Sequence, residues 1–195
     1  MNSSHLIHST IQEISQYPNK YYLIIVLLIL LSYGCSSSIK VLQDVTFPKP
    51  IGDIFISLQK NPYSSIITGD NPEYGSELRS CVSSFDSLLE KKLPTLLMAN
   101  GFIISDQREK ANVTLKLELT SFTPSYLYLY DLYGGQKYAR IFTGEGLWSL
   151  VVKFLNNSGI ITGSILVEYG SRLSTTEAAN KYLQSILSYL VEKSR

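Results

Sequence analysis

The sequence predicts an α+β domain in which an antiparallel meander sheet carries two helices on one face, a two-layer arrangement. Three observations lead to this fold class. Residues 76–100 and 174–193 repeat apolar side chains at the spacing of an amphipathic helix. Several other segments alternate apolar and polar residues, as strands with one buried face do. The order strand, helix, several strands, helix favours helices laid against one antiparallel sheet.

An apolar run near the N-terminus predicts a leader that is removed from the mature protein. Residues 21–31 form an unbroken apolar stretch of 11 residues, whereas a helix that spans a bilayer needs roughly 20. Lys20 precedes the run, and Gly34 followed at once by Cys35 ends it. This order resembles a bacterial lipoprotein signal. An uncleaved membrane anchor and a buried core helix are the alternatives.

The resemblance to a lipoprotein signal implies that residues 1–34 are a signal peptide and that fatty chains such as palmitate are attached at Cys35. Residues 35–43 are then expected to be a tether, and residues 44–195 a single globular domain. Ser32 and Tyr33 depart from the usual residues before the cysteine. Cys35 is followed by a serine rather than an aspartate, which implies the outer membrane, with the domain facing the periplasm.

The first part of the domain predicts one strand and one long helix. Residues 54–58 alternate, and residues 76–100 follow the helical period. Pro94 is expected to kink the helix or to end its first segment, and Gly101 to end the helix as a whole. Cys81 lies on the apolar side of the helix and is therefore expected to be a buried structural thiol.

The second part predicts strands followed by a helix. The strand-like segments are residues 111–120, 126–130, 138–155 and 160–169. The motif "NNSG" between the last two predicts a hairpin turn. Ser174 and Glu177 have the spacing of a capping box at the start of the final helix.

This layout resembles a known family. "SELRSCVSSFDSLLEKKLPTLLMANGF", "ANVTLKLELTSF", "NNSGII" and "STTEAANKYLQSILSYL" follow one another as in the YajG-type small outer-membrane lipoproteins. The resemblance covers roughly residues 44–191. It implies attachment to the outer membrane and transfers no catalytic residue.

Charge and histidine content narrow the function classes. Without residues 1–34 the chain loses one basic and one acidic residue, so its net charge stays at +1, which argues against a nucleic-acid partner. His5 and His8 both precede Cys35, so we expect no histidine-dependent catalysis, no metal site and no cofactor. Asp131 and Glu145 are a conceivable carboxylate pair, although loop carboxylates are usually only solvated. We therefore expect a protein that is not an enzyme.

Tyrosine usage gives the best indication of a binding surface. Tyr126, Tyr128, Tyr130 and Tyr133 lie close together, and the first three share one face of a strand. Tyrosine is favoured at interfaces, but it also suits an ordinary amphipathic strand. One hypothesis is a binding or assembly module that docks an envelope protein or a glycan. The alternative is a protein that handles lipids or glycans in a cleft between sheet and helices.

Overall fold

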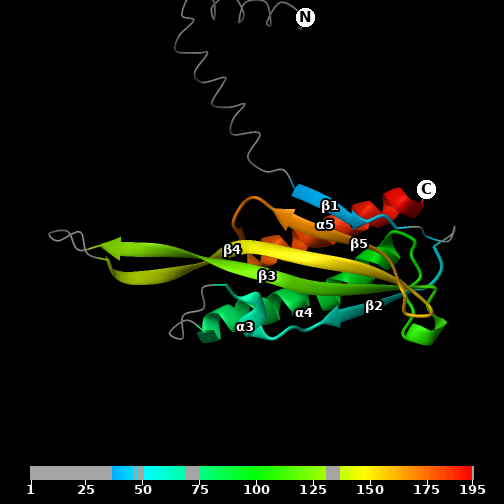
Figure 1. Cartoon of the computed structure of the whole chain (residues 1–195), viewed down its shortest axis with the longest axis horizontal. Helices are drawn as coiled ribbons and strands as arrows, with labels where there is room; N and C mark the ends of the chain where they lie inside the picture. Colours follow the sequence, from blue (N-terminus) through cyan, green and yellow to red (C-terminus); the bar gives the residue numbers. More distant parts are fainter. Residues whose placement is uncertain (1–36, 46, 48–50, 69–74, 131–136, 195) are drawn as a thin grey trace, which may run out of the picture. The chain divides into compact units, whose positions relative to one another are not determined.

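The computed structural model describes residues 37–45, 47, 51–68, 75–130 and 137–194 (Figure 1). The predicted signal peptide, residues 1–34, and the predicted lipidation site, Cys35, lie outside the described residues, as do Asp131 and Tyr133. Within the described ranges, no helix combines the length and the apolar character needed to cross a membrane.

The described strands form one sheet with the order β1-β5-β4-β3-β2, and a short β6 pairs with β4. The strands are β1 (Ser37–Gln43), β2 (Ile54–Gln59), β3 (Val113–Tyr130), β4 (Lys137–Asn156), β5 (Ile161–Tyr169) and β6 (Leu173–Ser174). All neighbours run antiparallel except β2 and β3, which run parallel. The fold is therefore α+β with a mostly antiparallel sheet, which agrees with the predicted class at that level.

The pairing of β2 differs from the wholly antiparallel sheet expected from the sequence. Strands β3, β4 and β5 follow one another as antiparallel neighbours. In contrast, Ile54 lies opposite Val113 in a parallel ladder between β2 and β3. The long helix α4 (Gly75–Ala99) connects these two strands. It returns the chain to the end of the sheet where β2 began, so β3 runs in the same direction as β2.

A second difference concerns residues 35–43, which the sequence predicts to be a tether. From Ser37 this segment is the edge strand β1, and it pairs antiparallel with β5. Lys40 in β1 also forms a 3.0 Å ion pair with Glu168 in β5. The sheet therefore begins well before residue 44.

Helix α4 runs without interruption through Pro94. It ends where the sequence predicts, because Gly101 has a φ of +86°. The amide N–H of Gly101 donates to Met98, and that of Phe102 donates to Leu97, so the last carbonyl groups of the helix are satisfied.

Cys81 in α4 is half-buried rather than fully buried. Its neighbours Leu78, Val82 and Phe85 are 0–1% exposed, so Cys81 lies at the flank of the apolar stripe. Burial raises the pKa of the Cys81 thiol; a hydrogen bond with Thr175 opposes this shift.

Helix α5 (Thr175–Ser194) begins with the predicted capping box. The carboxylate of Glu177 accepts a 3.2 Å hydrogen bond from the backbone N–H of Ser174, and the Ser174 hydroxyl accepts one of 3.4 Å from the N–H of Glu177. Two short helical turns complete the elements, α3 (Tyr63–Ile66) and η3 (Arg108–Lys110).

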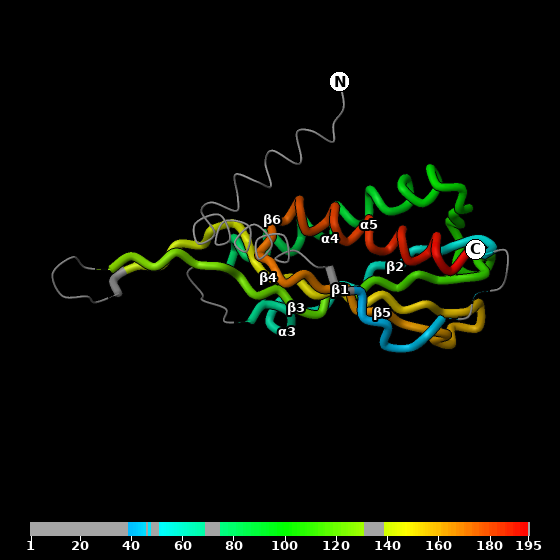
Figure 2. The backbone as a smooth tube through the Cα atoms, turned by 90° about the horizontal axis from the view of Figure 1, so that it is seen from above, coloured from blue at the N-terminus to red at the C-terminus, as the bar shows by residue number. Residues whose placement is uncertain are grey.

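The apolar stripes of α4 and α5 and the inward side chains of the strands form one core. Figure 2 shows the two helices running beside each other over the strands. Strand β3 contributes Leu115 and Leu117, which are 0–1% exposed. Trp148 of β4 stacks between the rings of Phe122 and Phe85, with centroid distances of 4.1 and 4.7 Å.

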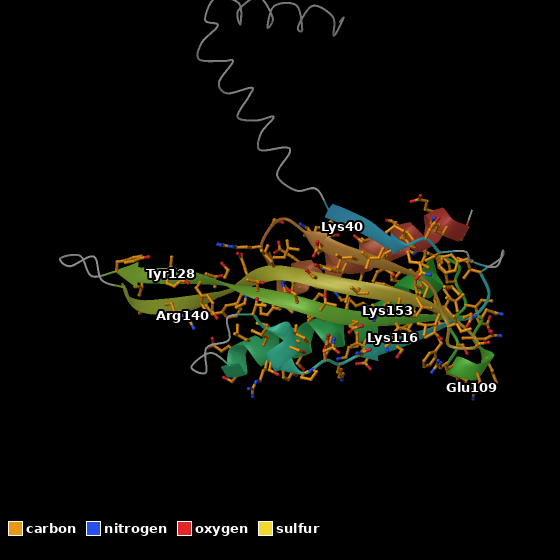
Figure 3. All side chains as sticks on the ribbon, in the orientation of Figure 1. Lys40, Glu109, Lys116, Tyr128, Arg140 and Lys153 are labelled. Atoms are coloured by element: carbon orange, nitrogen blue, oxygen red, sulfur yellow. The ribbon has the colours of Figure 1, made fainter. Side chains whose placement is uncertain are left out.

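The alternate side chains of the first part of β3, from Thr114 to Thr120, are polar. Lys153 and Glu118 form a 2.7 Å ion pair across β4 and β3. Figure 3 shows Lys116 and Lys153 on these neighbouring strands. The alternation predicted for β3 is therefore confirmed, with one apolar face and one polar face.

Candidate functional site

The ends of β3 and β4 extend as a two-stranded hairpin beyond α3 and α4 (Figure 1). Ile67 bridges to β3 at Phe122, and β6 pairs with β4 at Glu145 and Gly146. From Tyr126 onward, β3 pairs only with β4 in the part of the chain that the structure describes. We call residues 125–130 and 137–144 the β3–β4 arm.

The side chains of the arm alternate between two faces. The tyrosine face carries the cross-strand pairs Tyr126–Phe142 and Tyr128–Arg140, and the leucine face carries the pairs Leu127–Ile141 and Leu129–Ala139. At the base of the arm Phe142 still packs against the core, whereas no other described side chain of the arm belongs to it. Both faces therefore present apolar or aromatic groups outside the core.

Several of these groups are open to solvent. Leu127 is 56% exposed and Ile141 is 48% exposed, although they lie opposite each other on the leucine face. On the other strand face Tyr128 is 38% exposed, and Tyr130 near the end of β3 is 56% exposed. Adjacent exposed apolar side chains of this kind mark interaction surfaces more often than single ones do.

A row of aromatic rings joins the tyrosine face to the core. The centroid distances are 6.5 Å for Tyr128–Tyr126, 6.1 Å for Tyr126–Phe142, 6.4 Å for Phe142–Phe122 and 4.1 Å for Phe122–Trp148. The first three pairs are tilted or edge-on and the last is stacked, and both kinds of arrangement are favourable. The row therefore fixes the base of the arm to the core.

Arg140 supplies positive charge on the tyrosine face. Its guanidinium carbon lies 4.6 Å from the centre of the Tyr126 ring, which is within the range of a cation–π interaction. Figure 3 shows Arg140 and Tyr128 on the two strands of the arm. This face thus combines aromatic rings with a cation, a composition common at protein interfaces.

The arm contains three of the four tyrosines predicted to bind a partner, namely Tyr126, Tyr128 and Tyr130. The fourth, Tyr133, lies outside the described residues. The exposed Leu127 and Ile141 of the leucine face are not among the residues predicted to bind a partner. The unusual lengths of β3 and β4, 18 and 20 residues against 9 for β5, are a signal that the strands outrun the core.

A cleft between α4 and the sheet is a second candidate. It has a volume of about 250 Å³ and an apolar lining that includes Ile56 and Leu58 of β2, Leu89 and Leu93 of α4, and Ile104. Glu90 of α4 also lines it. The cleft therefore lies beside the β2 edge of the sheet.

Asp86 lies one helical turn before Glu90. Burial raises the pKa of the Asp86 carboxyl to about 6, the charge of Lys60 opposes this shift, and the charge of Glu90 adds to it. The α4 side of the cleft is consequently acidic at neutral pH.

The predicted absence of catalytic chemistry is not tested by this geometry. Glu145 is exposed at the base of the arm, and its conceivable partner, Asp131, lies outside the described residues. Among the described residues, no cluster of three or more histidine, cysteine, aspartate or glutamate side chains is arranged to hold a metal ion.

Comparison with known proteins gives similarities of fold alone. No protein-family model matches the sequence, and no curated protein matches it significantly. Among solved structures, the chain is similar to a PelC dodecamer from Paraburkholderia phytofirmans, with 12% identity and a TM-score of 0.41 over 82% of this chain and 99% of that one. It is also similar to a neuraminyllactose-binding hemagglutinin homolog from Helicobacter pylori, with 14% identity and a TM-score of 0.44 over 79% and 89%. At these values the similarity assigns no activity to this chain.

Proposed function

We propose that this chain is a cell-envelope lipoprotein, anchored through Cys35, whose globular unit docks a partner through the β3–β4 arm. In this proposal it is a YajG-type lipoprotein of the outer membrane, it faces the periplasm, and it is not an enzyme. Its partner is an envelope protein or a glycan, and no nucleic acid or cofactor takes part. We further infer a two-layer fold with α4 and α5 on one face of the sheet.

The observation that carries the proposal is the exposure of apolar side chains on both faces of the arm. A two-stranded hairpin is marginally stable in water on its own, and Leu127 and Ile141 gain nothing from the core beyond which they extend. A partner that covers them would remove this apolar surface from water and stabilise the arm. The exposed Tyr128 and Tyr130 then supply an apolar body with a polar tip at the rim.

The alternative function requires a cleft large enough to enclose a lipid chain or a glycan unit. The cleft between α4 and the sheet has a volume of about 250 Å³, below the roughly 300–1,000 Å³ of most ligand pockets. A larger and more open groove of about 430 Å³ is lined by residues of α4 and α5 alone, so it is not a cleft between sheet and helices. The small cleft and the exposed arm together favour docking over the handling of lipids or glycans.

Site-specific photo-crosslinking in intact cells tests the arm. A benzophenone amino acid in place of Tyr128 is expected to give a discrete adduct, because Tyr128 faces the proposed partner. Tyr63 is a matched control, since it is also 38% exposed but lies in α3. Equal crosslinking from both positions would contradict the proposal.

A double substitution, Leu127→Thr with Ile141→Thr, separates docking from folding. Threonine keeps the preference for strands but removes apolar surface. We expect the Tyr128 adduct to be lost while the melting temperature stays near that of the wild type. An adduct that survives the double substitution would exclude the leucine face from the interface.

The lipid anchor has its own test. Mass spectrometry of the purified wild type should find an N-terminus at Cys35 that carries acyl mass, since two or more fatty chains anchor stably. Cys35→Ala should leave an unprocessed precursor. An intact segment from Met1 to Lys20 on the wild-type protein would overturn the lipoprotein assignment and leave a domain held by an uncleaved segment.

A further inference from the structure

One edge of the sheet is only partly covered by the protein's own chain. After α4, the backbone runs beside β2, so that Ile54 donates a 2.8 Å hydrogen bond to the carbonyl oxygen of Ile103 and accepts one of 2.8 Å from the N–H of Ser105. The Ser105 side chain then bonds with the backbone of Gln107, and the chain turns away into η3. The cover of the β2 edge ends there.

The rest of β2 offers open backbone groups. In a regular strand, the N–H and C=O groups of every second residue point to the same side. The backbone N–H and C=O groups of Ile54 point away from β3. Because the β2–β3 register has no shift, the backbone groups of Ile56 and Leu58 point away from β3 as well. No described group outside β2 and β3 bonds to the backbone of Ile56 or Leu58. Among the described residues, two backbone donors and two backbone acceptors along this edge therefore have no partner.

The apolar cleft lies directly beside these free groups. Ile56 and Leu58 form its sheet side, Leu89 and Leu93 form its helix side, and Ile104 lies at the end where the chain leaves the edge. The same two β2 residues thus supply both open backbone groups and apolar side chains. An extended segment laid on this edge would place every second side chain over the cleft.

The charge beside the cleft favours one kind of segment. Glu90 lines the cleft, and Asp86 lies one turn away on the same helix. Lys60, just past the end of β2, is the nearby cation that acts on Asp86. Glu90 is the one charged side chain among the described residues that line the cleft, so this wall is negative and complementary to a basic residue.

We propose that the β2 edge and α4 form a groove for an extended peptide segment that adds to the sheet as a further strand. The segment places an apolar side chain in the cleft and a lysine or arginine against Glu90. Backbone hydrogen bonds along the edge supply affinity, and the cleft and its acidic wall supply specificity. This site is separate from the β3–β4 arm and does not depend on the function proposed for the arm.

A synthetic heptapeptide, Lys-Thr-Ile-Thr-Ile-Thr-Lys, with a fluorescent label is a suitable probe. Its alternation fits a strand with one apolar face, and a lysine at each end allows either direction of pairing. We expect saturable binding to the full chain in detergent, measured by fluorescence anisotropy. The peptide with glutamate in place of both lysines should bind more weakly, and equal binding of the two would contradict the proposed acidic wall.

N-methylation of the peptide tests strand addition without any change to the protein. In a strand, alternate amides point to the same side. Methylation of one alternate set should abolish binding, and methylation of the other set should leave it intact. If the two methylated peptides bind equally well, the peptide does not pair with the edge and the proposal is wrong.

Amide hydrogen exchange locates the pairing. In the free protein, the amides of Ile56 and Leu58 should exchange faster than those of Phe55 and Ser57, which point toward β3. The peptide should protect Ile56 and Leu58. Protection of these amides by concentrating the protein alone, with a doubled mass, would show that a second copy occupies the edge and would overturn the assignment to a peptide.

A matched pair of charge reversals completes the test. Glu90→Lys should weaken binding of the lysine peptide by about fivefold, as expected for an exposed ion pair that becomes a repulsion. Glu192→Lys makes the same charge change at an exposed position on α5 and should leave the affinity unchanged. Equal losses of peptide affinity in the two variants would show that only the net charge of the protein matters, and would contradict the proposed groove.

Discussion

The indole N–H of Trp148 donates a buried 3.1 Å hydrogen bond to the carbonyl oxygen of Leu173. The backbone carbonyl of Trp148 accepts a hydrogen bond from the Tyr182 hydroxyl of α5, and the indole ring of Trp148 stacks on Phe85 of α4. The Trp148 side chain therefore connects the centre of the sheet to β6 and α4, and the Trp148 backbone connects the sheet to α5.

Trp148→Phe is expected to lower the free energy of unfolding by about 2–3 kcal/mol. The smaller ring leaves part of the stacking site empty, and the carbonyl of Leu173 loses its buried donor. Urea denaturation measures the change. Tyr63→Phe, at an exposed position in α3, should stay within about 0.5 kcal/mol, and a loss as small at Trp148 would contradict the role given to this ring.

The two faces of β3 give a second prediction. Leu115→Ala and Leu117→Ala should each cost about 2–5 kcal/mol, because both side chains are buried in the core. Lys116→Ala on the polar face should cost no more than roughly 0.5 kcal/mol. Chemical denaturation of the three variants checks this, and similar losses at all three positions would be incompatible with the observed facing.

Cys81 should react slowly with alkylating reagents. Its thiol pKa is raised by burial above the ordinary value of 9.0, and the thiolate is the reactive form. In a Cys35→Ala background, where Cys81 is the remaining cysteine, iodoacetamide at pH 8 should modify the folded chain several-fold more slowly than the unfolded chain. Equal rates would show that Cys81 is neither shielded nor shifted in pKa.

Asp86 should make the protein less stable as pH rises from 3.8 toward 6. The carboxyl has a pKa of about 6 in the folded protein against an ordinary value of 3.8, so the folded state binds the proton more tightly. Its stability contribution is therefore present below pH 3.8 and lost as pH rises through 6. The group is only half-buried, and after allowance for solvent screening we expect a loss of about 1 kcal/mol.

Asp86→Asn tests this dependence. The variant should be more stable than the wild type at pH 7, and the difference should disappear near pH 3.5, where the wild-type carboxyl is protonated. Thermal melts at the two pH values suffice. A difference that does not change with pH would assign the effect to packing rather than to ionisation.

Much of the fold follows from local patterns in the sequence. The capping box of Ser174 and Glu177 and the stop at Gly101 depend on residues a few positions apart, so they are readable without the structure. The alternation in β3 is readable for the same reason. The class α+β follows from these elements and their order.

The structure differs from the sequence-based prediction where contacts between residues far apart in the sequence decide it. Strand β1 pairs with β5, yet the adjacent Val41 and Leu42 in it are 50% and 56% exposed, so neither side chain is buried in the core as the apolar residues of a half-buried strand are. The parallel direction of β2 is set by the crossover through α4 rather than by β2 itself. The cleft combines Ile56, Leu89 and Ile104 from three separate segments, and no single segment signals it.

Only part of the candidate binding surface could be predicted from the sequence. Clustered tyrosines point to Tyr126, Tyr128 and Tyr130, because their spacing places them on one strand face. The exposure of Leu127 and Ile141 depends on where the core ends, which is a property of the packed helices and not of the arm. A pattern of period two describes the faces of a strand but not what covers them.

The pairing of β1 with β5 has a consequence for the order of folding. Lys40 and Glu168, which join these strands by an ion pair, are 128 residues apart, whereas β3, β4 and β5 pair with their neighbours in sequence. Contacts at such separation form late, because the intervening chain must be ordered first. Strand β1 is synthesised before the other strands of the sheet, and we expect it to find its partner last. A growing chain therefore carries β1 unpaired until β5 is in place, and the β5 edge is the first that opens when β1 detaches.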